Sequence, residues 1–264
     1  MKRDSAWLIL SALGWAAFVA VVVWTMAFLA GVVVPRTVDG PQRIGPVGAV
    51  LCDLAWMSLF ALQHSVMARP AVKAAMRRRI PMVMERAVYV LATDVCLVLI
   101  LTLWQPFGGQ AWHLHGAAAG LLWGTYLAGW LLAVISTFAV DHLELTGLRQ
   151  AGWASPRRPG SDRLHVGGLH GVVRHPLMAG LVIAFWATPQ MSVAHLLFAA
   201  LGTAYVLVGI RFEERDLRRT FGPEYDAYAR RVPALLPLPV RRSGPSIPTT
   251  TGRDHSDTSR YPGT

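Results

Sequence analysis

Residues 6–34 read AWLILSALGWAAFVAVVVWTMAFLAGVVV and contain no charged side chain. At about 1.5 Å per residue, a helix of this length exceeds the roughly 30 Å thickness of the hydrocarbon core of a bilayer. Lys2 and Arg3 precede the run, but it is much longer than the core of a secretory signal, and no small-residue cleavage pattern follows it. The stretch therefore predicts a retained transmembrane helix.

The composition of the whole chain also indicates a membrane protein. Of the 264 residues, 53% are hydrophobic and 15% are charged, and the mean hydropathy is +0.40. These values exclude a soluble globular enzyme. The formal net charge is +10, and in so apolar a chain a basic excess is typical of cytoplasmic loops rather than of nucleic-acid binding. Cys52 and Cys96 fall inside apolar runs, so neither a disulfide framework nor a cysteine metal site is expected.

Further apolar segments predict an all-α integral membrane protein with five to six membrane helices. Three more long spans are expected at about 46–67, 85–104 and 117–140. The apolar region 175–211 is interrupted by the polar, proline-containing segment 187–192, which cannot continue a helix. We interpret this region as a tight helical hairpin, whose first arm is short for a full crossing.

The distribution of basic residues predicts the orientation of the spans. Lysine and arginine in short loops remain on the cytoplasmic side. With the N-terminus inside, every basic residue except Arg36 and Arg43 falls on that side, so we expect both termini in the cytoplasm of a bacterial cell and the protein in its cytoplasmic membrane. We expect one transmembrane domain over 1–240, and a polar tail over 241–264 with too little apolar surface to order itself.

Polar residues gather where three of the predicted spans reach the cytoplasmic surface. Ionisable groups in membrane segments are costly unless they meet a partner or a watery cavity, so they mark candidate functional sites. The residues in these three groups are His64, Ser65, Glu85, Arg86, Tyr89, His142, Glu144 and Arg149. Asp53 and Asp94 lie deeper and outside these groups, and for them a role in helix packing is the preferred interpretation.

The strongest pattern lies in the last third of the chain. Residues 168–180 read GLHGVVRHPLMAG, and after the hairpin come RFEERDL at 211–217 and FGPEYDAY at 221–228. This order resembles the membrane methyltransferase superfamily that includes isoprenylcysteine carboxyl methyltransferases and phospholipid methyltransferases. Met178 stands where that superfamily usually has tyrosine. The resemblance implies an S-adenosyl-L-methionine-dependent transferase.

Upstream segments narrow the resemblance to one branch. The stretches LQHSVMARP at 62–70, ERAVYVL at 85–91, HLELTGLRQ at 142–150 and FWATP at 185–189 resemble the methanethiol S-methyltransferases, so the likeness covers about 62–237. That branch implies methyl transfer from S-adenosylmethionine to methanethiol, a small volatile thiol, to give dimethyl sulfide. No metal, no nucleic acid and no obligate protein partner is expected.

The resemblance assigns the methyl donor to a set of residues near the hairpin. Glu213 and Glu214 are expected to accept hydrogen bonds from ribose hydroxyls or from the amino group, and Arg174 to meet the carboxylate. The full predicted set is Leu169, His170, Arg174, His175, Pro176, Gly180, Glu213 and Glu214. The alternative is an interfacial ion pair between Arg174 and Glu213 that joins the ends of the hairpin.

The chemistry of a thiol acceptor suggests roles for the other groups. A thiol attacks as its thiolate, so a proton acceptor is needed. His64 and His142 are the candidates, with Glu85 or Glu144 orienting them and Arg86 or Arg149 stabilising the anion. Ser65, Tyr89 and Trp186 are expected to contact the substrate.

Two other functions remain open at this stage. One is methylation of a lipid-borne acceptor, either a prenylcysteine carboxylate or a phospholipid amine, which needs a lateral opening between spans. The other is a non-catalytic membrane protein associated with nitrogen-oxide respiration. Haem or metal binding is disfavoured, because the histidines are separated and lack the spacing of known motifs.

Overall fold

The computed structural model describes residues 2–139, 148, 164 and 166–237. Within these ranges the chain is mainly helical, and five helices are long and apolar enough to cross a membrane. The described elements are α1 (Lys2–Ala30), α2 (Pro46–Met67), α3 (Pro70–Arg77), α4 (Met82–Leu103), β1 (Gln110–His113), α5 (Gly116–Ala139), η1 (Gly168–Gly171), α7 (Pro176–Trp186), β2 (Gln190–Ser192), α8 (Val193–Phe221) and α9 (Pro223–Ala229). The prediction of an all-α membrane protein is confirmed.

The first helix is shorter at its end than the apolar run predicts. α1 ends at Ala30 rather than at Val34, because Gly31 adopts a φ of 71° and leaves the helix. Glycine occupies this left-handed region without the steric penalty of a side chain. The backbone amide of Val38 then donates to the carbonyl of Phe28, so the loop turns back over the end of α1. Hydropathy alone does not register this turn.

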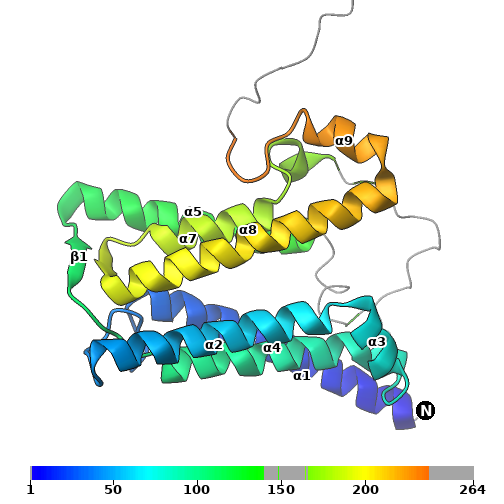
Figure 1. Ribbon diagram of the computed structural model, residues 1–264, viewed down its shortest axis with the longest axis horizontal. Helices are drawn as coiled ribbons and strands as arrows, with labels where there is room; N and C mark the ends of the chain where they lie inside the picture. The colour runs from blue at the N-terminus through cyan, green and yellow to red at the C-terminus, as the bar shows by residue number, and fades with distance from the viewer. Residues whose placement is uncertain (1, 140–147, 149–163, 165, 238–264) are drawn as a thin grey trace, which may run out of the picture.

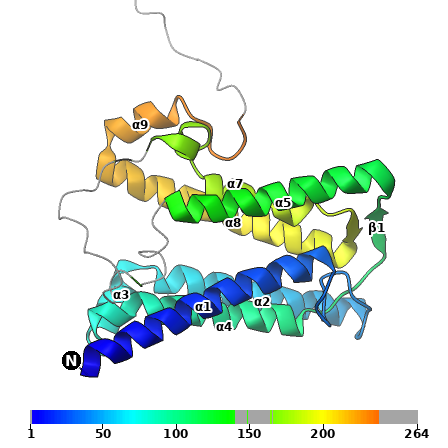
Figure 2. The ribbon, with the colours of Figure 1, turned by 180° about the vertical axis from the view of Figure 1, so that it is seen from behind.

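The helices form two layers that run roughly parallel to each other. α5, α7 and α8 lie in one layer and α1, α2 and α4 in the other, as Figures 1 and 2 show from opposite sides. Aromatic rings join the layers: Trp104, the residue that follows α4, packs edge-on against Phe28 and Phe198, with ring centroids 6.4 and 5.4 Å apart. Phe28 and Trp104 are fully buried. This contact holds α1, α4 and α8 at the same depth.

Small residues bring α5 and α7 into close contact. A Cβ added at Gly180 would lie 2.5 Å from the carbonyl oxygen of Gly129, and one added at Gly129 would lie 2.8 Å from the carbonyl oxygen of Gly180. Small residues at helix crossings are a common means of packing in membranes, because they let the backbones approach. Gly180 was expected to contact the methyl donor, and in the structure it lies at this crossing.

The predicted hairpin is present, and the connection between its two helices contains a short β-strand. α7 has 11 residues, about 16 Å of helix, which is too short to cross a bilayer alone. Residues 190–192 of the connection form β2, which pairs antiparallel with β1 of the α4–α5 connection. The indole of Trp112 also donates to the carbonyl of Thr188. The segment 187–192, expected to be a simple turn, is thus tied to a second loop.

Buried polar contacts fasten this same end of the molecule. Asp39, in the loop between α1 and α2, accepts hydrogen bonds from the Ser192 amide at 2.8 Å and from His195 Nδ1 at 3.0 Å. Asp53 accepts from the amide of Gln105 at 2.9 Å. Asp53 therefore has the packing role expected for it, joining α2 to the end of α4.

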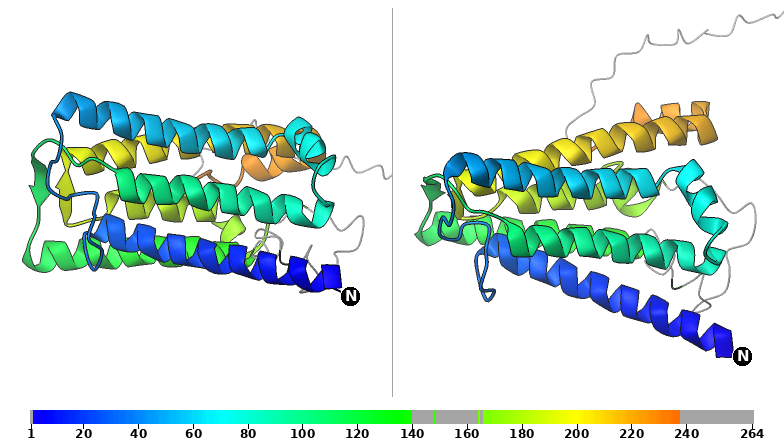
Figure 3. Two further views of the ribbon diagram at one scale, coloured as in Figure 1. Left: turned by 90° about the horizontal axis from the view of Figure 1, so that it is seen from below. Right: turned by 60° about the horizontal axis from the view of Figure 1, so that its bottom comes forward.

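The opposite end of the bundle carries the predicted functional segments. The start of α1, the short helix α3, the end of α8 and α9 lie together there, as Figure 3 shows. The sheet of β1 and β2 lies at the other end of the bundle (Figure 1). His142, Glu144 and Arg149 lie outside the described residues.

Candidate functional site

His64 lies at the centre of a hydrogen-bonded group between α2 and α4. Its Nε2 is 2.7 Å from the hydroxyl of Tyr89, and its Nδ1 is 3.4 Å from Oγ1 of Thr93. Thr93 Oγ1 lies 2.9 Å from the carbonyl oxygen of Tyr89, so its one hydrogen is donated there. His64 Nδ1 then carries the hydrogen it shares with Thr93, and Nε2 accepts from Tyr89, a tautomer assigned from these partners. The ring presents its lone pair toward the tyrosine hydroxyl.

A third helix closes this group from the other layer. Tyr205 of α8 places its hydroxyl 3.4 Å from Oγ of Ser65, and its ring centroid lies 6.1 Å from that of His64. Phe60 stacks on His64 at 5.5 Å and meets Tyr205 edge-on at the same centroid distance. We call His64, Ser65, Tyr89, Thr93 and Tyr205 the histidine cluster. The structure thus brings together three predicted residues from two helices.

Glu85 forms a salt bridge with Arg77 of α3, with Nε and Oε2 2.5 Å apart. Either Glu85 or Glu144 was expected to orient the two histidines, and His142 and Glu144 lie outside the described residues. The distances between His64 and its partners show instead that a tyrosine and a threonine orient the ring. Arg86, the next residue, lies with its guanidinium carbon 5.8 Å from the centre of the Tyr89 ring. A positive charge therefore lies beside the histidine cluster.

A second polar group lies where α7 begins and α8 ends. Arg174 donates from Nε and Nη2 to Oε1 of Glu214 at 2.9 and 2.5 Å, and from Nη1 to the carbonyls of Ala229 and Val232. The predicted alternative of an ion pair with Glu213 is wrong in its partner: Arg174 pairs with Glu214. Both side chains of the pair are almost buried. This arrangement fastens α9 to the hairpin.

His175 and Glu213 complete this second group, the arginine cluster, which we define as Arg174, His175, Glu213, Glu214 and Arg218. His175 is buried, with Nε2 3.3 Å from Glu214 and Nδ1 3.4 Å from Glu213. Arg218 reaches the other oxygen of Glu214 at 3.3 Å. Glu214 is therefore saturated by cations, whereas the side chain of Glu213 is 48% exposed. Glu213 is the carboxylate of this cluster with room for a ligand.

Tyrosines of α9 pack beside the arginine cluster, where the guanidinium of Arg218 lies over the ring of Tyr225. Tyr228 donates to the carbonyl of His170 at 2.6 Å, which fixes the short helix η1 against α9. Tyr225 is fully buried, and this burial, reinforced by the negative charge of Glu214, raises its pKa to about 12. The Tyr225 hydroxyl therefore stays neutral over the physiological pH range.

The other residues predicted to bind the methyl donor lie next to the arginine cluster and shape its backbone. Pro176 is buried at the first position of α7, where its missing N–H needs no partner. The carbonyl of Leu169 accepts from the amides of Val172 and Val173 and so closes η1. Leu169, His170 and Pro176 thus form the backbone frame of the arginine cluster.

Trp186 lies apart from both clusters. It is at the far end of α7, is 39% exposed, and donates from its indole to Thr203 Oγ1 at 2.9 Å. Tyr205 lies two positions after Thr203, so the two side chains point in directions about 200° apart around the axis of α8. Trp186 therefore contacts the face of α8 opposite to the one that meets His64.

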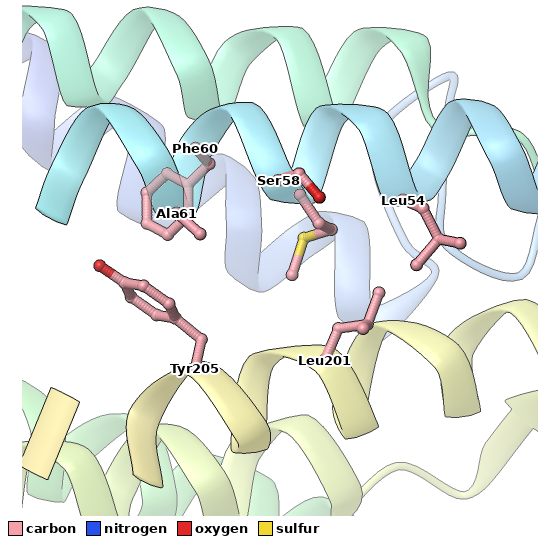
Figure 4. Close-up of a pocket in the computed structure, with 7 residues that line it drawn as sticks. Leu54, Ser58, Phe60, Ala61, Leu201 and Tyr205 are labelled. Carbon is pink, nitrogen blue, oxygen red and sulfur yellow. The ribbon is translucent and has the colours of Figure 1, made fainter. Parts of the chain in front are cut away.

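An apolar cleft runs between α2 and α8 beside the histidine cluster. Its volume is about 120 Å³, and it is partly open. Figure 4 shows Tyr205 and Leu201 of α8 facing Phe60, Ala61 and Leu54 of α2 across it. The residues that line it are Leu54, Met57, Ser58, Phe60, Ala61, Leu201 and Tyr205.

Sequence reasoning missed Tyr205, Thr93 and the cleft. Tyr205 lies in a strongly apolar helix, where a single tyrosine gives no signal until the neighbouring helix is known. Thr93 lies one helical turn after Tyr89, so its spacing on the same face was available in the sequence. Among the described residues, no cluster of His, Cys, Asp and Glu has the composition of a metal site.

The fold and its polar end define an integral membrane protein of the helical-bundle class with a candidate active site at one end of the bundle. Comparison with known proteins is more specific. Methanethiol S-methyltransferase 2 of Bradyrhizobium diazoefficiens is 44% identical over 233 residues, which are 87% of this chain and 89% of that protein. Methanethiol S-methyltransferase of Mycobacterium tuberculosis is 40% identical and matches over its entire length. The chain belongs to the methanethiol S-methyltransferase family of membrane methyltransferases.

Other comparisons are more distant or negative. Nurim of Rattus norvegicus is 30% identical over 190 residues, which are 64% of this chain and 70% of that protein. No protein-family model matches the chain, and no solved structure matches it.

Proposed function

We propose that this enzyme transfers the methyl group of S-adenosylmethionine to the sulfur of methanethiol. The observation that carries this proposal is the histidine cluster, which sets an oriented proton acceptor beside an apolar cleft at the same end of the bundle as an accessible carboxylate. The relatives named methanethiol S-methyltransferase support the choice of acceptor.

The residues of the arginine cluster suit the polar parts of the donor. Glu213 is exposed and bonded only to His175 in the described contacts, so it can accept hydrogen bonds from ribose hydroxyls or from an ammonium group. Arg174 already directs its donors to Glu214 and to two carbonyls. We therefore assign donor binding to Glu213, with the buried His175 positioning its carboxylate, and give Arg174 and Glu214 the role of holding this surface in shape.

When bound, S-adenosylmethionine supplies an electrophilic methyl group: a bond forms from this carbon to the acceptor sulfur, the bond to the sulfonium sulfur breaks with its electron pair, and the thiol proton is released. Tyr205 and Glu213 are eight residues apart on α8, roughly 12 Å along its axis. The two clusters thus lie close enough in depth to hold two reactants side by side. Positioning of this kind can supply much of the rate acceleration.

His64 and Tyr89 provide the path for the thiol proton. The Tyr89 hydroxyl donates to His64 Nε2, so its oxygen can accept the proton of a thiol while its own proton passes to the histidine. The nearby guanidinium of Arg86 favours negative charge on the sulfur. His142 remains a second proposed acceptor.

We also propose that this end of the bundle faces the cytoplasm. Lys73 and Arg77 of α3, the arginines at the end of α8, and Arg230 and Arg231 after α9 lie at this end, as does Arg174, which pairs with Glu214 of α8. Basic residues favour the cytoplasmic side. S-adenosylmethionine is a polar molecule of the cytosol, so its binding site is expected on that side. Residues 1–240 form one domain in this proposal.

The test uses membranes that carry the protein, methanethiol, and S-adenosylmethionine with a labelled methyl group. We expect labelled dimethyl sulfide in the headspace, and none from membranes without the protein. A His64→Gln variant tests the proton acceptor and should retain donor binding but lose most turnover. Donor binding by the native enzyme without labelled dimethyl sulfide would point to a different acceptor, and absence of donor binding would refute the proposal.

A further inference from the structure

We infer that the cleft between α2 and α8 is the acceptor site and that its walls limit the enzyme to thiols with short alkyl groups. This inference rests on the methyl transfer proposed above. The wall residues that set this limit are Met57, Ala61 and Leu201. None of them belongs to the polar clusters, and their role is to select the alkyl group rather than to move protons.

Most of the residues of α2 that line the cleft lie on one face of that helix. On α2 the residues Leu54, Met57, Ser58 and Ala61 follow the i, i+3, i+4, i+7 pattern of a single helix face. One further turn along that face brings His64 and Ser65. The apolar cleft therefore leads directly into the histidine cluster. A substrate with an apolar end and a reactive end needs this arrangement, because the first lies in the cleft and the second at the cluster.

The facing helix has the same organisation. Leu201 and Tyr205 are one turn apart on α8, and both line the cleft. The Tyr205 hydroxyl marks the polar end, 3.4 Å from Ser65 Oγ. One turn further, Gly209 leaves open space, because a Cβ added there would meet no described atom within 4 Å. Tyr205 thus lies where the apolar wall of the cleft meets the polar groups of the histidine cluster.

Exposed apolar side chains next to the residues that line the cleft suggest how the acceptor arrives. Leu62 of α2 is 64% exposed and Val208 of α8 is 47% exposed, and both belong to helices that are long enough to span the bilayer. Exposed apolar side chains on spanning helices face lipid. A small neutral thiol that dissolves in the hydrocarbon can reach the cleft from that side without crossing the charged rim.

The size of the cleft decides which acceptor fits. Its 120 Å³ is small beside the roughly 300–1,000 Å³ of sites that hold drug-sized ligands. Met57, Ala61 and Leu201 approach the space from both walls. This volume matches a short alkyl group and is smaller than a prenyl chain, most of which would extend beyond these walls.

Two substitutions with opposite effects test the inference. Leu201→Ala enlarges the cleft and should raise kcat/KM for butanethiol relative to methanethiol by about tenfold or more, the effect expected for a methylene in an apolar pocket. Ala61→Phe fills the cleft and should raise KM for methanethiol at least tenfold, with donor binding unchanged. Leu207→Ala, at an exposed position of α8 that does not line the cleft, is the matched control.

The readout is labelled product from a series from methanethiol to hexanethiol, with binding of labelled S-adenosylmethionine measured in the same membranes. Retained donor binding shows that a variant is folded. If the native enzyme methylates methanethiol but both cleft variants keep the chain-length profile of Leu207→Ala, the cleft inference is overturned and the proposed function stands. If the native enzyme binds the donor and methylates no thiol in the series, the proposed function is refuted, and the cleft inference that rests on it is refuted as well.

Discussion

The hydroxyl of Tyr89 is the single group through which a proton reaches His64 in the proposed path. Tyr89→Phe keeps the ring that lies beside Arg86 but removes the hydrogen bond to Nε2. We expect kcat for methanethiol to fall roughly 100-fold, the lower part of the range for acid–base catalysis, with donor binding unchanged. Turnover is measured as labelled dimethyl sulfide. Native kcat in this variant would remove Tyr89 from the proton path.

The two neighbouring glutamates are expected to have different roles, with Glu213 binding the methyl donor and Glu214 stabilising the fold. Glu213→Gln removes an exposed carboxylate, so we expect weaker donor binding and an unchanged melting temperature. Glu214→Gln leaves the cation of Arg174 without its buried partner, and breaking such a pair is strongly destabilising. We expect its melting temperature in detergent to fall by several degrees. The opposite result for the two variants would reverse the roles assigned to them.

At the scale of helices, the crossing of α5 and α7 depends on two glycines. The Cβ introduced by Gly180→Ala would meet the backbone of Gly129 at 2.5 Å and that of Ala133 at 2.7 Å, neither of which can move alone. We expect a lower melting temperature and reduced yield of folded protein. Gly124→Ala on the same α5 is the control, because its Cβ meets open space and alanine favours a helix by about 1 kcal/mol.

The same substitution also tests the predicted contact of Gly180 with the methyl donor. If Gly180→Ala folded as well as Gly124→Ala but bound the donor more weakly, the position would act through ligand contact rather than through helix packing. Thermal unfolding and donor binding measured on one purified sample distinguish the two effects.

At the scale of the whole molecule, the proposed orientation predicts which loops a reagent can reach. With Cys52 and Cys96 replaced by alanine, Gln110→Cys in β1 should react with a membrane-impermeant maleimide in intact cells. Lys73→Cys in α3 should react only after the cells are broken, because α3 lies at the opposite, basic end. Labelling of Lys73→Cys in intact cells, with Gln110→Cys protected, would invert the proposed topology.

Span positions could be predicted because hydropathy is a property of each segment by itself. The second span was expected at 46–67 and α2 has those bounds, and the short hairpin arm was recognised from the proline-containing break after Trp186. The ends of α1, the strand pair and the short helices α3 and α9 were not predicted. These depend on local backbone geometry and on pairing between distant loops, which apolar runs do not encode.

The residues of the candidate site were predicted in part for the same reason. His64 and Tyr89 stand out in sequence because polar groups in an apolar chain need partners, whereas Arg174 and Glu214 were singled out by the resemblance to the membrane methyltransferases. Their actual partners did not follow, since Glu85 pairs with Arg77 and Arg174 with Glu214 rather than with the expected residues.

The sequence by itself determined that the chain is a helical membrane protein, which ends of its spans carry polar groups, and which family it resembles. Only the tertiary structure decided that Tyr205 closes the histidine cluster, that Glu213 is accessible while Glu214 is saturated, and that a small cleft leads to His64. The physical reason is that hydropathy and motifs act along one segment, whereas partners and cavities depend on how separate helices cross and rotate against one another.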